Sequence, residues 1–284
     1  MNQVATSYDE LVPSAVSGTA SSEDEARPDS LEQGDAEGSG GGARSLDRPF
    51  AILRVLRENR APMRLTEIAT AAQLHLATTQ RLVNLLIRHG YVEREGLEYR
   101  LGLVSLINGF TYLLTNSPTQ IAEPILIELT NSTKLTSVLN VRNDLTQVKV
   151  LRVLGHPSPR YQAEVGEQVS LVFGGARIFA ASLSPEDLER LLEGVERIPL
   201  ASGRVLDRQE FIDSLGAIRE RGYAFGQGQG GGGSVSIAVP VNDRQGEVVA
   251  SVQVTGLIED IPVDVDALVY ELRRASAAIT RRIP

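Results

Sequence analysis

The sequence predicts an α+β protein with two unlike domains, a small N-terminal one and a larger C-terminal one built on an antiparallel sheet. Three short helical patterns followed by a strand alternation occupy residues 48–101. Farther along, strand patterns at 235–241 and 248–254 are joined by a turn at 242–246, which predicts an antiparallel hairpin. A long hairpin among mixed helices and strands favours α+β over a parallel sheet. The 284 residues suffice for two such domains.

Residues 1–44 are predicted to be a disordered acidic tail. They are rich in Ser, Gly, Asp, Glu and Ala, and the segment 38–42 is almost entirely glycine. Such a composition buries too little apolar surface to offset the entropy lost on ordering. The segment also lacks the basic start and the unbroken apolar run of a secretion signal.

The next elements predict a winged helix-turn-helix. A first helix begins at Arg48, and a second begins at Thr66, whose hydroxyl can cap it. A third helix covers 77–89, and Gly90 is suited to the left-handed residue that ends it. Alternation within 91–101 predicts a β-hairpin. Three short helices followed by a hairpin are the elements of a winged helix-turn-helix.

The rest of the chain mixes helices and strands. A helix is expected from about 103 to 116, where Ser117 and Pro118 break the pattern. The further elements follow in two groups. Helices are expected at about 119–132, 172–182, 185–194, 207–221 and 263–281, and strands at 137–141, 148–154, Tyr223, 235–241 and 248–254.

The charge is unevenly distributed along the chain. The formal net charge of −8 taken whole argues against a nucleic-acid partner. Residues 1–47, however, hold two basic and ten acidic side chains, which accounts for the whole value. Residues 48–102 hold nine Arg and five Glu, and residues 103–284 hold 17 basic and 21 acidic side chains. The basic excess therefore coincides with the helix-turn-helix pattern.

This coincidence predicts double-stranded DNA as a partner. A helix fits the major groove, its first residues reach base edges, and flanking arginines hold phosphates. Gln80 can bond adenine, the threonine methyls can touch thymine, and Arg81 can reach guanine or phosphate. The candidate DNA contacts are Arg48, Arg64, Thr78, Thr79, Gln80, Arg81, Arg94 and Arg100.

Two alternatives stay open at this point. Winged helices also serve as protein-interaction or dimerisation modules, and a basic cluster is usually a solvated face. The acidic tail is either a solvated segment or an arm that competes with DNA for the basic domain.

The ordered motifs resemble those of the IclR family of bacterial transcription regulators. In the first domain the matching segments are 45–48, 51–53, 65–69, 77–82, 90–92 and 99–102. In the second domain they are 221–224, 236–241 and 248–256, so the resemblance covers nearly all of 45–282. The ordered set is specific, whereas one such string alone would be weak.

The resemblance implies a cytoplasmic regulator, with repression the expected mode. It implies a DNA-binding domain at 45–102, a linker helix at 103–117 and an effector-binding, oligomerising domain at 118–284 with a GAF/PAS-like sheet. It also implies a palindromic operator bound by a homodimer or homotetramer. The same resemblance places Gly174, Gly175, Gly226, Ser236, Gln253 and Thr255 around an effector pocket.

Several positions depart from the family pattern. Leu76 and Ala77 stand where a basic residue and a serine are usual, which removes one phosphate contact and one hydroxyl. Ser236 replaces a common cysteine, and the usual acidic pair falls within the glycine-rich run 226–233. A pocket without acidic groups suits a small organic acid or a neutral polar molecule, unless it has drifted and binds nothing. A ligand-gated interaction module that has lost DNA is the alternative function.

The sequence shows no residue pattern for disulfide, metal or catalytic chemistry. There is no cysteine, which excludes disulfides, zinc–thiolate sites and a cysteine nucleophile. His75, His89 and His156 lack ligand spacing, so no metal is expected. No paired carboxylates or Gly-x-Ser-x-Gly motif stand out, so we expect no enzyme and no cofactor. The best apolar stretch, 101–114, is too short and too interrupted for a membrane span.

Overall fold

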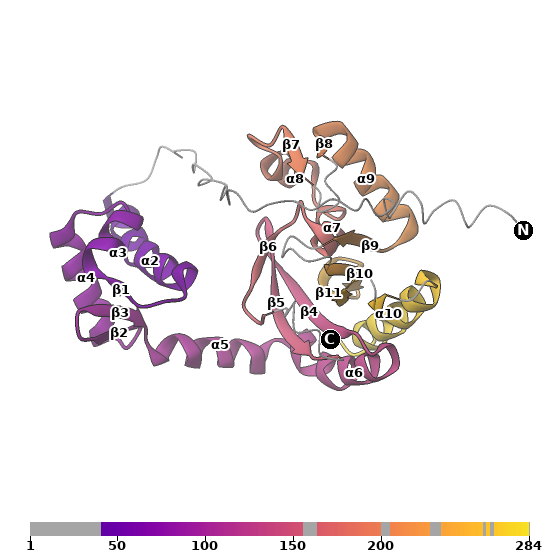
Figure 1. The fold of residues 1–284 in the computed structure, drawn as a ribbon, viewed down its shortest axis with the longest axis horizontal. Coiled ribbons are helices and arrows are strands. Elements are labelled where there is room, and N and C mark those ends of the chain that lie inside the picture. The colour runs from indigo at the N-terminus through magenta and orange to yellow at the C-terminus, as the bar shows by residue number, and fades with distance from the viewer. Residues whose placement is uncertain are drawn as a thin grey trace, which may run out of the picture. The chain divides into compact units, whose positions relative to one another are not determined.

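The computed structural model describes residues 41–155, 164–199, 205–227, 234–257, 260–261 and 264–283. Most of the predicted tail, His156 and the end of the glycine-rich run therefore lie outside the described residues. The chain divides into two compact units between Tyr112 and Leu113. Figure 1 labels most of the helices and strands of both units.

The first unit is a winged helix-turn-helix, as predicted. Its elements in order are α2 (Gly41–Asn59), β1 (Met63–Arg64), α3 (Leu65–Ala71), α4 (Leu76–Arg88), β2 (Val92–Glu95) and β3 (Glu98–Leu101). Helix α5 (Leu103–Thr115) follows, and the division between the units falls within it. The three strands form an antiparallel sheet in the order β1-β3-β2. Its core is a single cluster of buried side chains from α2, β1, α3, α4 and the hairpin. These are Ile52, Leu56, Met63, Ile68, Leu82, Val83, Leu86, Val92 and Tyr99.

The starts of the helices differ from the sequence prediction. Helix α2 begins at Gly41, so disorder through residue 44 is wrong for its last four residues. The glycines suggested a linker because glycine has a low helix propensity. Helix propensity is, however, a weak predictor of structure at the end of a helix. Thr66 does not cap α3, because that helix begins one residue earlier. Instead the backbone N–H of Arg64 donates to Glu67 Oε2 at 2.7 Å.

Gly90 ends α4 as predicted. Its φ is +73°, in the left-handed region where glycine is favoured. A Cβ there would lie 2.8 Å from Val104 Cγ2. The turn into the wing is thus both conformationally and sterically restricted to glycine.

The second unit is built on a six-stranded antiparallel sheet. Its strands are β4 (Thr136–Asn143), β5 (Thr146–Val153), β6 (Gln168–Ser170), β9 (Ala224–Gln227), β10 (Ser234–Asn242) and β11 (Val248–Leu257). They lie in the order β6-β5-β4-β11-β10-β9, and every neighbouring pair is antiparallel. The predicted hairpin is β10–β11, in which Val239 pairs with Val252. The predicted α+β class is confirmed.

Helices cover both faces of this sheet (Figure 1). On one face α6 (Ser117–Thr133) and α10 (Val265–Thr280) pack against the sheet around one apolar core. On the other, η1 (Gly174–Ala176), α7 (Arg177–Ala180), α8 (Pro185–Leu191) and α9 (Arg208–Arg221) enclose a second core. The predicted break before α6 is confirmed, and Asn116 caps that helix by accepting from Thr119 N–H at 3.2 Å.

Strand β11 shows how the sheet separates its two faces. Ala250, Val252 and Val254 enter the core beneath α6 and α10. Because successive strand residues face opposite sides, Ser251, Gln253 and Thr255 lie on the other face. All three polar side chains are buried. This alternation places the predicted effector residues on the side of η1 and α7.

The short elements were not predicted. Strands β1, β6, β7 (Arg197–Pro199) and β8 (Val205–Asp207) have two or three residues each, too few for a periodic pattern. The helix expected at 172–182 is only η1 and α7, residues 174–180. Within the parts of the chain that the structure describes, no helix is long and apolar enough to cross a membrane.

Candidate DNA-binding and effector sites

The outer face of α4 is the candidate DNA-reading surface. Ala77, Arg81, Asn84 and Arg88 are exposed at the spacing of one helical stripe. Gln80 is half-buried beside them, and its Nε2 donates to Asn84 Oδ1 at 3.1 Å. Side-chain amides and guanidinium groups on one face of a helix are the groups that read base edges and hold phosphates. The sequence prediction did not include Asn84 and Arg88, although both lie on this stripe.

Thr79 is the predicted DNA contact that the structure does not place on this face. Its side chain is fully buried, with 0% exposure. Its hydroxyl donates to the backbone carbonyl of His75 at 3.2 Å. The prediction that it contacts a base is therefore wrong, because the inward face of α4 includes this position. Thr78 is half-buried and stays at the edge of the surface.

The wing carries two of the predicted arginines, and both have intramolecular partners. Arg94 donates to the Gly96 carbonyl at 2.8 Å and lies 5.7 Å from the centre of the Tyr99 ring. Arg100 pairs with Glu93 at 3.4 Å and with Glu95 at 3.1 Å.

The remaining two predicted arginines lie on other elements of the unit. Arg48 is exposed on α2, and Arg64 is exposed at the start of α3. On the wing, Glu93 and Glu95 offset much of the positive charge. The side chains available to read bases are therefore concentrated on α4.

Five of the six predicted effector residues come together at η1 in the second unit, and the sixth, Thr255, pairs with Ser236 across β10 and β11. Gly175 N–H donates to Ser236 Oγ at 3.1 Å, and Ser236 Oγ donates to the Gly226 carbonyl at 3.3 Å. A Cβ on Gly226 would lie 2.5 Å from Gly174 Cα, so the two backbones touch. Gly174 has φ +49°, which a glycine adopts freely.

Gln253 and Thr255 complete this cluster from β11. A Cβ on Gly175 would lie 2.8 Å from Gln253 Oε1, so this amide packs directly on η1. Thr255 Oγ1 donates to the Val235 carbonyl at 3.0 Å. The cluster therefore presents amide and hydroxyl groups in a buried setting.

Two arginines near the cluster were not predicted. Arg177 donates to the carbonyls of Phe225 at 2.6 Å and Gly174 at 3.3 Å. Burial, with a smaller contribution from the charge of Arg221, lowers the pKa of Arg177 to about 10. Burial also lowers the pKa of Arg221, which donates to the Tyr223 carbonyl at 2.8 Å. Arg177 fixes η1 and β9 relative to each other.

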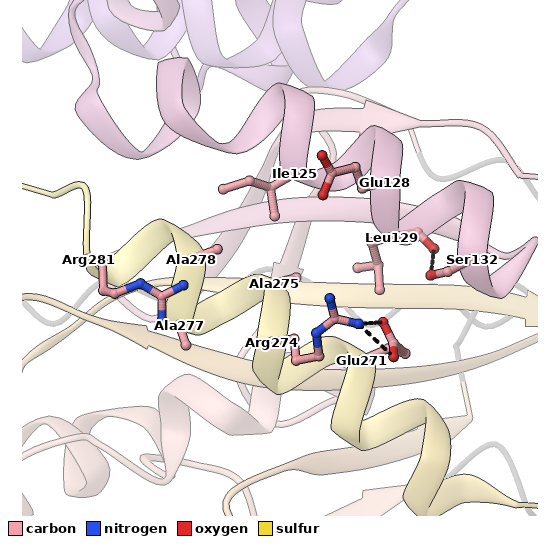
Figure 2. A pocket seen from close by; sticks show the side chains of 10 residues that line it. All are labelled: Ile125, Glu128, Leu129, Ser132, Glu271, Arg274, Ala275, Ala277, Ala278 and Arg281. Atoms are coloured by element: carbon pink, nitrogen blue, oxygen red, sulfur yellow. Dashed lines mark hydrogen bonds and ion pairs between the residues drawn. The ribbon is translucent and has the colours of Figure 1, made fainter.

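A separate groove of about 390 Å³ lies between α6 and α10 (Figure 2). Ile125 and Leu129 line it from α6, and Ala275 and Ala278 line it from α10. Charged side chains also line it, and Arg274 pairs with Glu271 at 3.0 Å. This groove is on the opposite face of the sheet from η1, so it is distinct from the predicted effector cluster. Among the described residues, no three His, Cys, Asp or Glu side chains gather as a metal site would require.

Comparison with known proteins identifies the family. The C-terminal domain of bacterial transcriptional regulator IclR matches residues 111–281, and the IclR helix-turn-helix domain matches residues 45–96. The chain belongs to the IclR family. This confirms the predicted family and its two-domain fold. The protein is thus an IclR-type transcriptional regulator with a DNA-binding domain and an effector-binding domain.

Several curated IclR relatives align along most of the chain. The regulator XynR of Escherichia coli is 23% identical over 243 residues, covering 84% of this chain and 96% of XynR. The glycerol operon regulatory protein of Streptomyces griseus is 28% identical, covering 84% of this chain and 95% of that protein. The transcriptional repressor IclR of Escherichia coli is 26% identical, covering 79% and 84%.

Solved structures share the IclR fold. The regulator from Alicyclobacillus acidocaldarius superposes with a TM-score of 0.74 at 23% identity, covering 85% of this chain and 99% of that one. An IclR homologue from Microbacterium hydrocarbonoxydans in complex with 4-hydroxybenzoate gives 0.71 at 20% identity, covering 84% and 98%.

Proposed function

We propose that this IclR-type regulator is a repressor that binds a palindromic operator through α4, and that a small effector in the second unit modulates this binding. The observation that carries the proposal is the outer face of α4. It gathers Gln80, Arg81, Asn84 and Arg88 in a segment, 48–102, with nine arginines and five glutamates. The protein acts by binding in the cytoplasm, where the operator is, and catalyses no reaction.

Base reading is assigned to the first three turns of α4. Gln80 and Asn84 are amides that suit adenine, and Arg81 suits guanine or a phosphate. Their mutual hydrogen bond orders the two amides before DNA arrives. Arg88, at the far end of the helix, together with Arg48 and Arg64, is assigned to phosphates.

A second copy of the chain is needed for a specific site, because one small winged helix covers too little DNA. Helix α5 supports a homodimer. Its apolar side chains Leu103, Leu106, Ile107 and Phe110 are all more than half exposed, and α5 buries no residue. Monomers rarely expose so contiguous an apolar surface. We assign α5 to the dimer interface; a homotetramer would add contacts between second units.

The effector is assigned to the cluster at η1. It is the place where buried hydroxyl, amide and backbone N–H groups converge, as they do in small-molecule sites. The homologue bound to 4-hydroxybenzoate supports a small polar effector. An organic acid and an uncharged polar molecule both fit this description.

The test is DNA affinity measured by fluorescence anisotropy on the region upstream of the gene. The double variant Gln80→Ala/Arg81→Ala is expected to weaken specific binding at least about 30-fold, since each of the two base contacts contributes about 1–3 kcal/mol. Arg274→Ala, on α10 in the other unit, removes an arginine without touching α4 and is expected to bind as the parent does.

Specific binding unchanged in the double variant would overturn the assignment of α4. The salt dependence of binding tests the alternative of an interaction module that no longer binds DNA. For a DNA-binding protein the logarithm of the association constant falls linearly with the logarithm of the salt concentration. The exposed Leu76 at the start of α4 motivates the alternative, which predicts no DNA affinity at any salt concentration.

A further inference from the structure

A row of buried polar side chains crosses the sheet beside the effector cluster. Lys149 on β5 pairs with Asn140 on β4, and Asn140 pairs with Ser251 on β11. Gln147 flanks the row on β5 and Gln253 flanks it on β11. Each of the five is at most 3% exposed. A row of five such side chains within strands is unusual, because polar groups are costly to bury without partners.

The lysine of this row is neutralised within the chain. Lys149 Nζ lies 2.6 Å from Glu167 Oε2. Backbone hydrogen bonds hold the two residues together, since Lys149 N–H donates to the Glu167 carbonyl at 3.1 Å. The row therefore has hydrogen-bonding capacity with no net charge.

Two oxygens of the row lack a hydrogen-bond donor. Asn140 Nδ2 donates to Ser251 Oγ at 3.3 Å and lies 3.4 Å from Gln253 Oε1. Asn140 Oδ1 and Gln147 Oε1, in contrast, accept no hydrogen bond from any described residue. Nearly all buried polar atoms in native proteins have a partner. Two orphaned acceptors on neighbouring strands indicate a partner that supplies donors.

The chemistry of that partner follows from these groups. A hydroxyl donates one hydrogen bond and accepts two, so it can satisfy an amide oxygen and an amide N–H together. A carboxylate only accepts, so it would face the two orphaned oxygens without a proton to offer. An anion buried within the row would also need an unneutralised cation there, whereas the lysine of the row, Lys149, is paired with Glu167. Arg177 lies outside the row at η1, where its guanidinium donates to the carbonyls of Gly174 and Phe225.

We propose that Asn140, Gln147 and Lys149 extend the effector site along the sheet and select an uncharged polyhydroxylated ligand, a polyol or a sugar. Gln253 joins the two parts, because it contacts both Asn140 and Gly175. The inference rests on the proposed function in that the ligand of this row is the effector of the regulator.

The test measures ligand binding to the full-length protein by thermal shift and calorimetry. The neutral probes are glycerol, erythritol, ribitol, sorbitol and D-ribose, and the anionic probes are lactate, pyruvate and ribonate. Ribonate matches ribitol except for one carboxylate end. At least one neutral probe is expected to raise the melting temperature, and ribonate is expected to bind at least tenfold more weakly than ribitol.

Two variants test the residues. Asn140→Leu and Gln147→Leu each replace an orphaned amide acceptor by an apolar side chain, and each is expected to weaken binding of the neutral probe at least tenfold. Asn143→Leu, on the exposed end of the same strand, is the matched control and is expected to bind as the parent does. The melting temperature without ligand shows whether each variant is folded, and the two variants serve as independent tests.

Three results would overturn the proposal: anionic probes binding while neutral ones do not, no probe binding, or a folded Asn140→Leu and Gln147→Leu that both bind undiminished. DNA affinity measured on the same samples without probe separates this from the proposed function. A protein that binds a polyol but no DNA would contradict the proposed repressor function and support the polyol site at the row. A protein that binds DNA but no probe would support the repressor function and contradict the polyol site.

Discussion

Thr79 shows what a sequence can and cannot assign at the scale of one residue. Its place in the first turn of α4 suggested a base contact, but the turn has both an outer and an inner face. Which face a residue takes depends on the rotation of the helix about its axis. That rotation is set by the packing of Leu82, Val83 and Leu86 in the core.

Thr79→Val is therefore expected to leave operator affinity within twofold of the parent. The substitution preserves the buried shape and removes one internal hydrogen bond, so unfolding is expected to become easier by about 1 kcal/mol. Fluorescence anisotropy and chemical denaturation check the two values. A tenfold loss of affinity with an unchanged fold would restore Thr79 as a DNA contact.

Two glycines of the second unit differ in what surrounds them. Gly226→Ala places a methyl 2.5 Å from Gly174 Cα, where backbone rather than a flexible side chain must move. It is expected to lower the free energy of unfolding by about 1–3 kcal/mol. Gly216→Ala, within α9 and facing open space, is expected to raise it by up to about 1 kcal/mol. Urea denaturation measures both, and equal effects would contradict the contact of η1 with β9.

At the scale of elements, long periodic segments were predictable and short ones were not. The hairpin β10–β11 and the helices α4, α6, α9 and α10 carry their own patterns, so the sequence alone located them. Strands β6, β7 and β8 have three residues each and exist because a neighbouring strand pairs with them. The polar row was not predictable for the same reason, because Gln147 and Lys149 become part of it only when β4 and β11 lie beside β5.

Helix α5 carries the prediction on assembly. Leu106→Glu with Phe110→Glu is expected to convert the dimer to a monomer, because two charges would enter an apolar interface. Leu97→Glu is the matched control, since Leu97 is an exposed leucine of the same unit at the tip of the wing. Sedimentation equilibrium gives the oligomeric state. A double variant that remains dimeric would exclude α5 as the interface.

At the scale of the whole molecule, the division of charge matters more than its sum. Residues 1–40 hold nine acidic and one basic side chain, which equals the net charge of −8 of the entire chain. The family and the two domains could be predicted because their motifs occur in a fixed order. The effector could not, because its identity depends on the side chains that several strands bring together.

Deletion of residues 1–40 is expected to raise non-specific DNA affinity at low salt by about threefold to tenfold. The acidic segment raises the local negative potential, and salt screens this effect beyond about 10 Å at 0.1 M. The difference between the truncated and the full-length protein should therefore vanish as salt rises. Equal affinity at low salt would exclude the segment as a competitor of DNA.

The two edges of the large sheet have a consequence for how second units meet. One edge, β6, is three residues long. At the other edge, Arg177 donates a hydrogen bond to the carbonyl of Phe225 in β9. Arg221 donates one to the carbonyl of Tyr223, just before that strand. Short edges and edge cations hinder the addition of another strand. Second units should therefore join through their helical faces, and the sheet should resist growth into a shared ladder between molecules.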